Sequence, residues 1–272
     1  MNDALVFLLA PTVMCVILSI IHCYLGLHVL ARGVIFVDLS LAQVASFGAT
    51  LALLWDPEHH AGSSYFISLG ATFVAAGVFA LARRYESYFS QEAIIGIVYA
   101  MASAAVVLVV DRLAHGAEHL KEALIGQILW VAWPEVIKTA LIYVVVGIVF
   151  FIFRRQFFAS SSRDQKTHWV WDFLFYALFG VVITSSTHIA GVLMVFSFLI
   201  VPSLLSGLFF ESWGRRLLFG CIFSATLSVV GMYVSYRLDL PVGALMVVLF
   251  TLMPILALLV LPLFPNLGRR RT

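Results

Sequence analysis

The chain has 272 residues, of which 62% are hydrophobic and only 11% are charged, and its mean hydropathy is +1.06. A soluble domain carries about 25% charged residues, so this chain lacks the polar surface that a water-soluble globule needs. Its net charge of +2 does not indicate nucleic-acid binding, because the basic residues are spread over loops. We therefore expect an all-α polytopic membrane protein with a single transmembrane domain over residues 1–272.

Nine apolar stretches are long enough, or nearly so, to cross about 30 Å of hydrocarbon as helices of about 20 residues. In chain order they lie near residues 4–30, 34–55, 65–82, 93–110, 137–153, 169–186, 188–210, 217–236 and 240–264. A polar run, Ser185–His188, separates the sixth stretch from the seventh, so one of the two could be a broken or re-entrant helix. The sequence thus predicts eight or nine transmembrane helices.

The basic residues predict the orientation of these helices. Most of the 16 lysines and arginines fall in alternate loops, namely Arg32, Arg83, Arg84, Arg154, Arg155, Arg163, Lys166, Arg215, Arg216, Arg269, Arg270 and Arg271. The remaining loops hold only Arg112, Lys121, Lys138 and Arg237. Because cytosolic loops are enriched in lysine and arginine, we expect the N-terminus outside and the C-terminus in the cytosol.

The second stretch holds an isolated acidic residue, Asp38, followed by Gln43. A carboxylate at the centre of a membrane span costs roughly 3 kcal/mol on insertion scales, so such residues usually handle a cation or proton or pair with another polar group. We assign both residues to a metal pathway; a hydrogen bond to a neighbouring helix is the alternative for each. On a regular helix they lie about 140° apart, so a joint site needs a distorted helix or ligands from other spans.

Two further acidic residues near the cytosolic ends of spans have simpler interpretations. Glu92 starts a span, where a carboxylate is favoured by the helix dipole. Asp172 stands beside Trp169 and Trp171, a combination typical of an anchor at the membrane interface.

The outer loop Asp111–Glu135 is predicted to form an amphipathic helix at the membrane surface. One face of this helix would carry two imidazoles and two carboxylates, from His115, Glu118, His119 and Glu122. These groups can bind a first-row divalent metal, so His115, Glu118 and His119 are candidate outer ligands; a solvated helix face is the alternative.

The same loop matches the His-x-x-Glu-His pattern of inverted zinc peptidases. Such an enzyme needs a further glutamate ligand downstream on the same side of the membrane. Beyond Glu135 the only glutamate is Glu211, which the predicted topology places in the cytosol. The peptidase interpretation therefore fails.

Two other segments carry candidate functional residues. His188 lies at the outer mouth of the seventh stretch and is a candidate ligand for an ion on the pathway. The longest cytosolic segment, Arg154–His168, is polar, basic and rich in serine, which suits the docking of a cytosolic partner. The residues that we assign to docking are Arg154, Arg155, Ser161 and Arg163.

Three stretches together resemble the permease subunit of metal-ion ATP-binding-cassette importers of the zinc, manganese and iron type. The most specific is Ala190–Ser203, which is similar to a Gly-Val-Leu-Leu-Val…Leu-Leu-Ile-Pro-Ala segment of that family. The others are Gln91–Tyr99 and the stretch around Asp38, and the order and spacing match as far as Leu240–Ala244.

This resemblance implies a homodimeric permease in a bacterial inner membrane. It would work with a cytosolic ATPase and an extracytoplasmic metal-binding protein, and would move zinc, manganese or iron without a permanently bound cofactor. The chain has no Gly-Lys dipeptide and hence no phosphate-binding loop. We therefore expect it not to be an enzyme, with ATP hydrolysis on a separate subunit.

The chain departs from the family pattern in its second span, where the family's aspartate is followed four residues later by a histidine. Here Asp38 and Gln43 are five apart, and the span has no histidine. A carboxylate with an amide suits manganese or iron better than zinc, whereas the histidines of the outer loop favour zinc. A stand-alone ion-coupled carrier is the alternative function, but it would usually show an internal repeat with paired broken helices, and none is visible.

Overall fold

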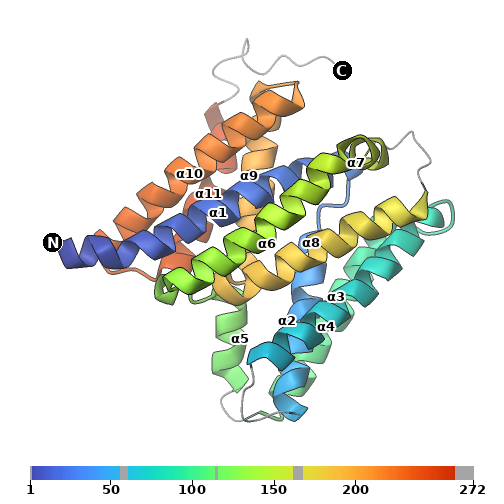
Figure 1. Cartoon of the computed structure of the whole chain (residues 1–272), viewed down its shortest axis with the longest axis horizontal. Coiled ribbons are helices and arrows are strands. Elements are labelled where there is room, and N and C mark those ends of the chain that lie inside the picture. Colours follow the sequence, from blue (N-terminus) through green and yellow to red (C-terminus); the bar gives the residue numbers. More distant parts are fainter. Residues whose placement is uncertain (1, 56–60, 114–115, 162–167, 261–272) are drawn as a thin grey trace.

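The computed structural model describes residues 2–55, 61–113, 116–161 and 168–260, which form eleven α-helices and one short 3-10 helix, with no β-strand among them. The helices are drawn in Figure 1. Their bounds are α1 (Asn2–Arg32), α2 (Val37–Trp55), α3 (Ala61–Arg84), α4 (Gln91–Val110), α5 (Gly116–Ile125), η1 (Ile128–Trp130), α6 (Trp133–Ile152), α7 (Arg154–Ser161), α8 (Trp169–Ala190), α9 (Val192–Phe209), α10 (Trp213–Leu238) and α11 (Val242–Val260).

Nine of these helices are long and apolar enough to cross a membrane, and they match the nine predicted stretches. The exceptions among the described helices are α5 and α7, with 10 and 8 residues, and η1, with 3. The polar run Ser185–His188 lies inside α8, which continues to Ala190. The chain turns at Gly191, so the sixth and seventh stretches are two complete helices, and the described residues hold nine candidate spans.

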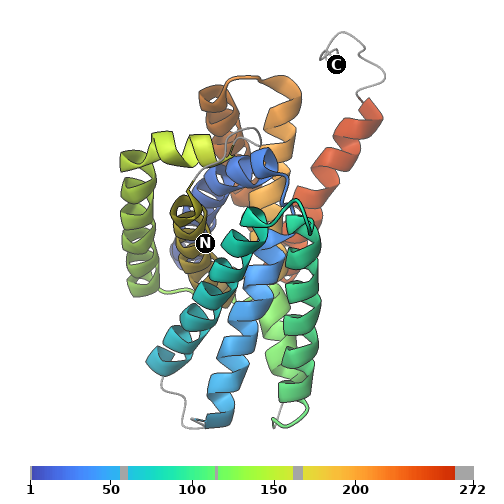
Figure 2. The same cartoon turned by 90° about the vertical axis from the view of Figure 1, so that its right-hand side faces the viewer.

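Two groups of helices meet at α8. In one group, α2 lies between α3 and α4, and both α2 and α3 pack against α8. In the other group, α1 packs against α9 and α10, and α11 packs against α9 and α10. Figures 1 and 2 show α2, α3 and α4 as a bundle beside the second group, and Figure 2 shows α7 turned sharply away from α6. The buried apolar side chains of both groups form one continuous core.

An ion-pair network joins the ends of four helices, at what we call the basic end of the bundle. The carboxylate of Asp172, at the start of α8, lies 3.0 Å from the guanidinium of Arg32 on α1 and 3.3 Å from that of Arg83 on α3. The hydroxyl of Ser160 on α7 donates to the same carboxylate oxygen at 2.8 Å. Asp172 is only 4% exposed. Its expected role as an interfacial anchor is therefore wrong, because it is the buried centre of this network.

Hydroxyl groups tie α8 to three neighbouring helices further along its length. Thr184 lies 3.3 Å from Thr72 of α3, measured between hydroxyl oxygens. The hydroxyl oxygen of Ser185 lies 3.3 Å from that of Tyr143 on α6. The Ser186 hydroxyl lies 3.2 Å from the Nε2 of His22 on α1. Polar side chains of this kind hold membrane helices together where lipid removes the hydrophobic driving force.

The turn between α8 and α9 is locked against the segment that follows α5. Gly191 and Gly126 both have positive φ, 76° and 72°, and their backbones lie against each other. The backbone N–H of Gln127 donates to the carbonyl of Ile189 at 3.0 Å. We call this contact the glycine lock, and it lies at the end of α8 opposite the basic end.

The helix α5 does not lie where the sequence predicts it. Its existence is confirmed, but it packs against α4, α8 and α9, and both views draw it roughly parallel to α2 and α4 (Figures 1 and 2). It therefore lines the bundle instead of lying across the ends of the spans. The glycine lock supplies the physical reason, because it holds the last residue of α5 against the α8–α9 turn.

Gly191→Ala should destabilise the protein by about 2 kcal/mol or more. A left-handed backbone costs a non-glycine residue roughly 1–2 kcal/mol. In addition, a Cβ at position 191 would lie 2.4 Å from the backbone nitrogen of Gly126. The midpoint of thermal unfolding of the purified protein in detergent measures the effect. Gly147→Ala is the control, because a Cβ there meets nothing within 4 Å; equal midpoints for the two variants would contradict the lock.

Candidate functional site

A polar cavity of about 380 Å³ opens beside the glycine lock, at the end of the bundle opposite the basic end. Six helices and the α5–α6 connection contribute to its wall. From the helices, the lining residues are Ser46, Ala49, Thr50 and Leu53 of α2, Ser64 of α3, Glu122 and Ala123 of α5, Glu135 of α6, Thr187, His188 and Ile189 of α8, and Val192 of α9. The α5–α6 connection adds Gln127, Trp130 and Val131.

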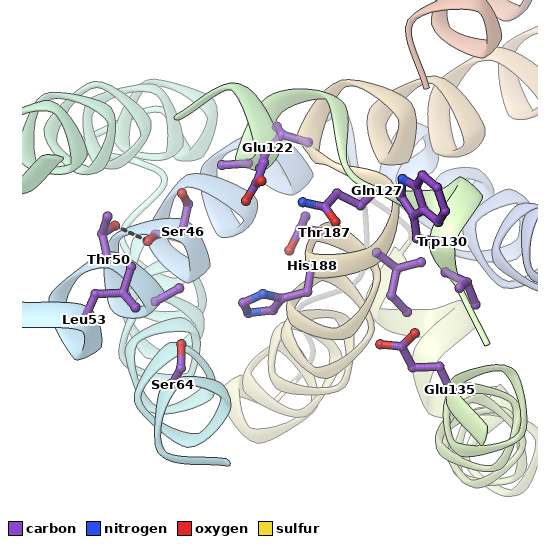
Figure 3. Close-up of a pocket in the computed structure, with 15 residues that line it drawn as sticks. Ser46, Thr50, Leu53, Ser64, Glu122, Gln127, Trp130, Glu135, Thr187 and His188 are labelled. Atoms are coloured by element: carbon purple, nitrogen blue, oxygen red, sulfur yellow. Dashed lines mark hydrogen bonds between the residues drawn. The ribbon is translucent and has the colours of Figure 1, made fainter. Parts of the chain in front are cut away.

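Three ionisable side chains line this cavity from three different helices. Figure 3 shows the ring of His188 in the cavity, on the side of α2 and α3, and the carboxylates of Glu122 and Glu135 turned toward the same space. All three side chains are exposed, and His188 stands in the last turn of α8. Hydroxyl and amide groups complete the polar wall. A cation entering here would meet two negative charges and one imidazole.

The cavity is a vestibule rather than a finished metal site. Over residues 2–55, 61–113, 116–161 and 168–260, no three side chains of histidine, cysteine, aspartate or glutamate lie close enough to hold one ion together. His188 is thus placed at the cavity as the sequence predicts, but without a set of neighbouring ligands. Negative charge in a cleft raises the local concentration of cations, and Glu122 and Glu135 supply such charge at this cavity.

The helix α2 connects this cavity with the basic end. Ala49 and Thr50 line the cavity. Gln43 precedes Thr50 by about two helical turns, and Asp38 precedes Ala49 by about three. Each therefore lies on the same side of α2 as the cavity-lining residue that follows it. The helix is regular through both positions. Asp38 and Gln43 therefore do not form the joint site that a distorted helix would create.

Asp38 is the most deeply buried carboxyl group on this route. It stands in the first turn of α2 and is 1% exposed. Neither carboxylate oxygen has a hydrogen-bond partner of normal geometry within the described part of the chain, and the groups facing it are the backbone N–H groups of Asp38 and Leu39. Gln43 is 9% exposed. Asp38 is thus a buried acid close to the end of a span, and its assignment to a metal pathway stays a prediction.

The candidate outer ligands are only partly described. Glu118 is exposed on α5 and does not line the cavity. The side chain of His119, on the same helix, and the whole of His115 lie outside the described residues. The member of this helix face that reaches the cavity is Glu122.

Residues 154–161 of the predicted docking segment form the short helix α7 at the basic end. Arg154 and Arg155 are exposed at its start, and the Arg154 guanidinium lies 5.0 Å from the centre of the Phe151 ring. Ser161 is 3% exposed, and its hydroxyl lies 2.8 Å from the Nδ1 of His28. The assignment of the Ser161 side chain to docking is therefore wrong, because it faces the interior. Arg163 lies outside the described residues.

The sequence pattern misses the contribution of Glu135 to the cavity. Glu135 lies in the first turn of α6, and position alone suggests a helix N-terminus. Glu122 and Glu135 lie on either side of the α5–α6 connection, and Trp130 of that connection lines the same cavity. The short connection between the two acids is the sequence feature that could have indicated their proximity.

The chain is similar in sequence to membrane proteins of metal transport systems. The chain is 23% identical to the manganese transport system membrane protein MntC of Listeria innocua over 263 residues, which cover 94% of this chain and 91% of the relative. It is 25% identical to a "Probable iron transport system membrane protein" of Haemophilus influenzae over 259 residues, or 92% of this chain and 89% of the relative.

A solved structure has the same fold. It is PsaBC from Streptococcus pneumoniae in complex with Fab, which is matched with a TM-score of 0.73 and 18% identity over 90% of this chain and 88% of that one. The family model described as the ABC 3 transport family matches residues 4–261, nearly the whole chain. This chain is a member of the ABC 3 transport family.

Proposed function

We propose that this chain is the membrane-spanning permease subunit of an ATP-binding-cassette importer for a divalent metal ion, with manganese or iron favoured over zinc. The observation that carries the proposal is that one helix, α2, lines a cavity with Glu122, Glu135 and His188 and also carries the buried Asp38. The relatives named for manganese and iron transport support this choice of metal. The carboxylate oxygens of Glu122, Glu135 and Asp38 also support this choice, because oxygen ligands suit manganese better than zinc.

The same proposal assigns a direction to the route. The predicted topology places the basic end in the cytosol and the cavity on the outer face, in the inner membrane of a bacterium. An ion delivered by an extracytoplasmic binding protein would enter the cavity near His188. It would leave near Asp38, after passing Gln43. A pathway of this kind needs sites weak enough to release the ion.

The energy source is proposed to be a separate ATPase, since this chain has no phosphate-binding loop. Two copies of the chain would pair with cytosolic ATPase subunits. Arg154 and Arg155 on α7 are the exposed basic residues proposed for docking. Because α7 is tied through Ser160 to Asp172 at the start of α8, a movement of the ATPase there would reach the spans.

Uptake of Mn²⁺ should occur only when this chain is produced together with a metal-binding protein and an active ATPase partner. The measurement is uptake of radioactive manganese into cells that lack other manganese importers. We expect background uptake when the phosphate-loop lysine of the ATPase is replaced. We also expect Arg154→Glu combined with Arg155→Glu to lower co-purification of the ATPase several-fold, because the docking surface loses its positive charge.

Two controls make this test decisive. Arg112→Glu and Arg237→Glu change basic residues that the topology places outside, and both should leave ATPase association unchanged. Uptake by this chain without any ATPase would identify it instead as a stand-alone ion-coupled carrier. Intact ATPase association in the α7 double variant would place docking elsewhere on the basic end.

A further inference from the structure

Two carboxyl groups from different helices meet at the starts of α2 and α4. Glu92 stands in the first turn of α4, and its Oε1 accepts a hydrogen bond of 3.1 Å from the backbone N–H of Phe36. Phe36 lies just before α2, two residues ahead of Asp38. Because α2 packs against α4, this hydrogen bond brings the Glu92 carboxylate to the start of α2, where Asp38 stands in the first turn. The fold thus brings together two acids that are 54 positions apart in the sequence.

Within the part of the chain that the structure describes, neither acid forms an ion pair with a basic side chain. Both oxygens of Asp38 and the Oε2 of Glu92 are buried and make no hydrogen bond within the described residues. The arginines at the ends of α1 and α3 do not serve them, because Arg32 and Arg83 both bind Asp172. A buried carboxylate without a partner of opposite charge costs several kcal/mol, so a cation bound at this pair would offset that cost.

A purely structural role does not account for this pair. A carboxylate in the first turn of a helix gains about 0.3–1 kcal/mol from the helix dipole at an exposed position. That gain is smaller than the penalty for burying an unpaired carboxylate. Capping explains one oxygen of Glu92, the Oε1 bound to Phe36, but it leaves three buried oxygens without partners.

We propose that Asp38 and Glu92 form a divalent-cation site at the basic end of the route, with Glu92 as the second oxygen donor beside Asp38. This inference rests on the proposed function and adds a residue from α4 to the pathway. Hard divalent cations such as Mn²⁺ bind carboxylate oxygens. Among the described residues, no histidine, cysteine or further acid joins the pair as a third ligand. Water therefore completes the coordination of the ion. Such a site holds its cation loosely, as a transport step requires.

Glu92→Gln separates the charge of this side chain from its capping role. The amide oxygen of glutamine still accepts the hydrogen bond from Phe36, so the start of α2 keeps its support. The negative charge is lost. In the complete transporter we expect the Mn²⁺ concentration for half-maximal uptake to rise about tenfold, on the scale at which metal-site substitutions act. Protein abundance in the membrane should stay at the wild-type level.

Glu86→Gln is the matched control, because Glu86 is an exposed acid in the α3–α4 turn. A second readout is the rise in thermal midpoint that Mn²⁺ gives the purified transporter, which Glu92→Gln should reduce and Glu86→Gln should not. If Glu92→Gln behaves like Glu86→Gln in both measurements, the cation site is refuted while the proposed function stands. If the wild-type transporter takes up no Mn²⁺, the proposed function itself fails.

Discussion

Asp38→Asn should lower metal uptake by about tenfold or more while leaving protein abundance and ATPase association unchanged. Asparagine has nearly the same shape as aspartate, but it lacks the charge that attracts a divalent cation. Loss of a group at a metal site commonly lowers affinity or activity 10- to 100-fold. Asp38 is 1% exposed, so its charge is buried, and a buried charge without a partner is costly. Because Asp38→Asn removes that charge, the fold should tolerate the change. Uptake of Mn²⁺, normalised to membrane protein, measures the effect.

Two further variants decide between a ligand and a structural residue. Asp38→Ala should transport no better than Asp38→Asn if the carboxylate binds the ion. If Asp38 is structural, Asn should preserve uptake and Ala should lower abundance. Asp111→Asn changes an exposed acid directly after α4 and serves as the control. Normal uptake by Asp38→Asn would rule out the ligand assignment.

Asp172→Ala should destabilise the protein by about 3–5 kcal/mol, the usual effect of removing one partner of a buried ion pair. Arg32 is 5% exposed and would keep a buried positive charge without its carboxylate. The network around Asp172 also holds α7 and α3, so the loss should appear as a lower unfolding midpoint and lower abundance. Glu86→Ala, at an exposed acid near the same end of the bundle, should leave both unchanged.

A double variant tests the mechanism of this loss. Arg32→Met combined with Asp172→Leu removes both charges and should recover part of the stability, because a buried pair can often be replaced by apolar residues of similar volume. Arg83 can turn toward solvent, since its side chain is already 14% exposed. An unfolding midpoint of Asp172→Ala equal to that of the wild type would mean that the network contributes little.

The number of spans could be predicted because it depends on local composition. A helix must supply about 20 apolar residues to cross the bilayer, and that requirement is visible in any window of the chain. The end of the sixth span is less visible. The hydroxyls of Ser185 and Thr187 donate to carbonyls one turn back in α8, those of Val181 and Ile183, at 3.0 and 2.8 Å. The helix therefore continues through a run that looks like a loop.

The candidate site could be predicted only in part, because its contacts join distant segments. Asp38 and His188 are visible as single polar residues at apolar stretches. The partner of Asp172 is 140 residues away at Arg32, and no local pattern reveals it. The neighbouring tryptophans instead suggest the membrane interface. In the same way, the approach of Glu92 to Asp38 depends on how α2 and α4 pack, which neither span encodes alone.

The 22 residues of α8 make a rod about 33 Å long that is attached at both ends. At one end Asp172 is bound to α1, α3 and α7, and at the other His188 faces the cavity. A tilt of about 10° around the Asp172 end would carry the far end through roughly 6 Å, the rise of about four helical residues. The ion-pair network would be the pivot of such a tilt, which would displace the part of the cavity wall that Thr187, His188 and Ile189 form.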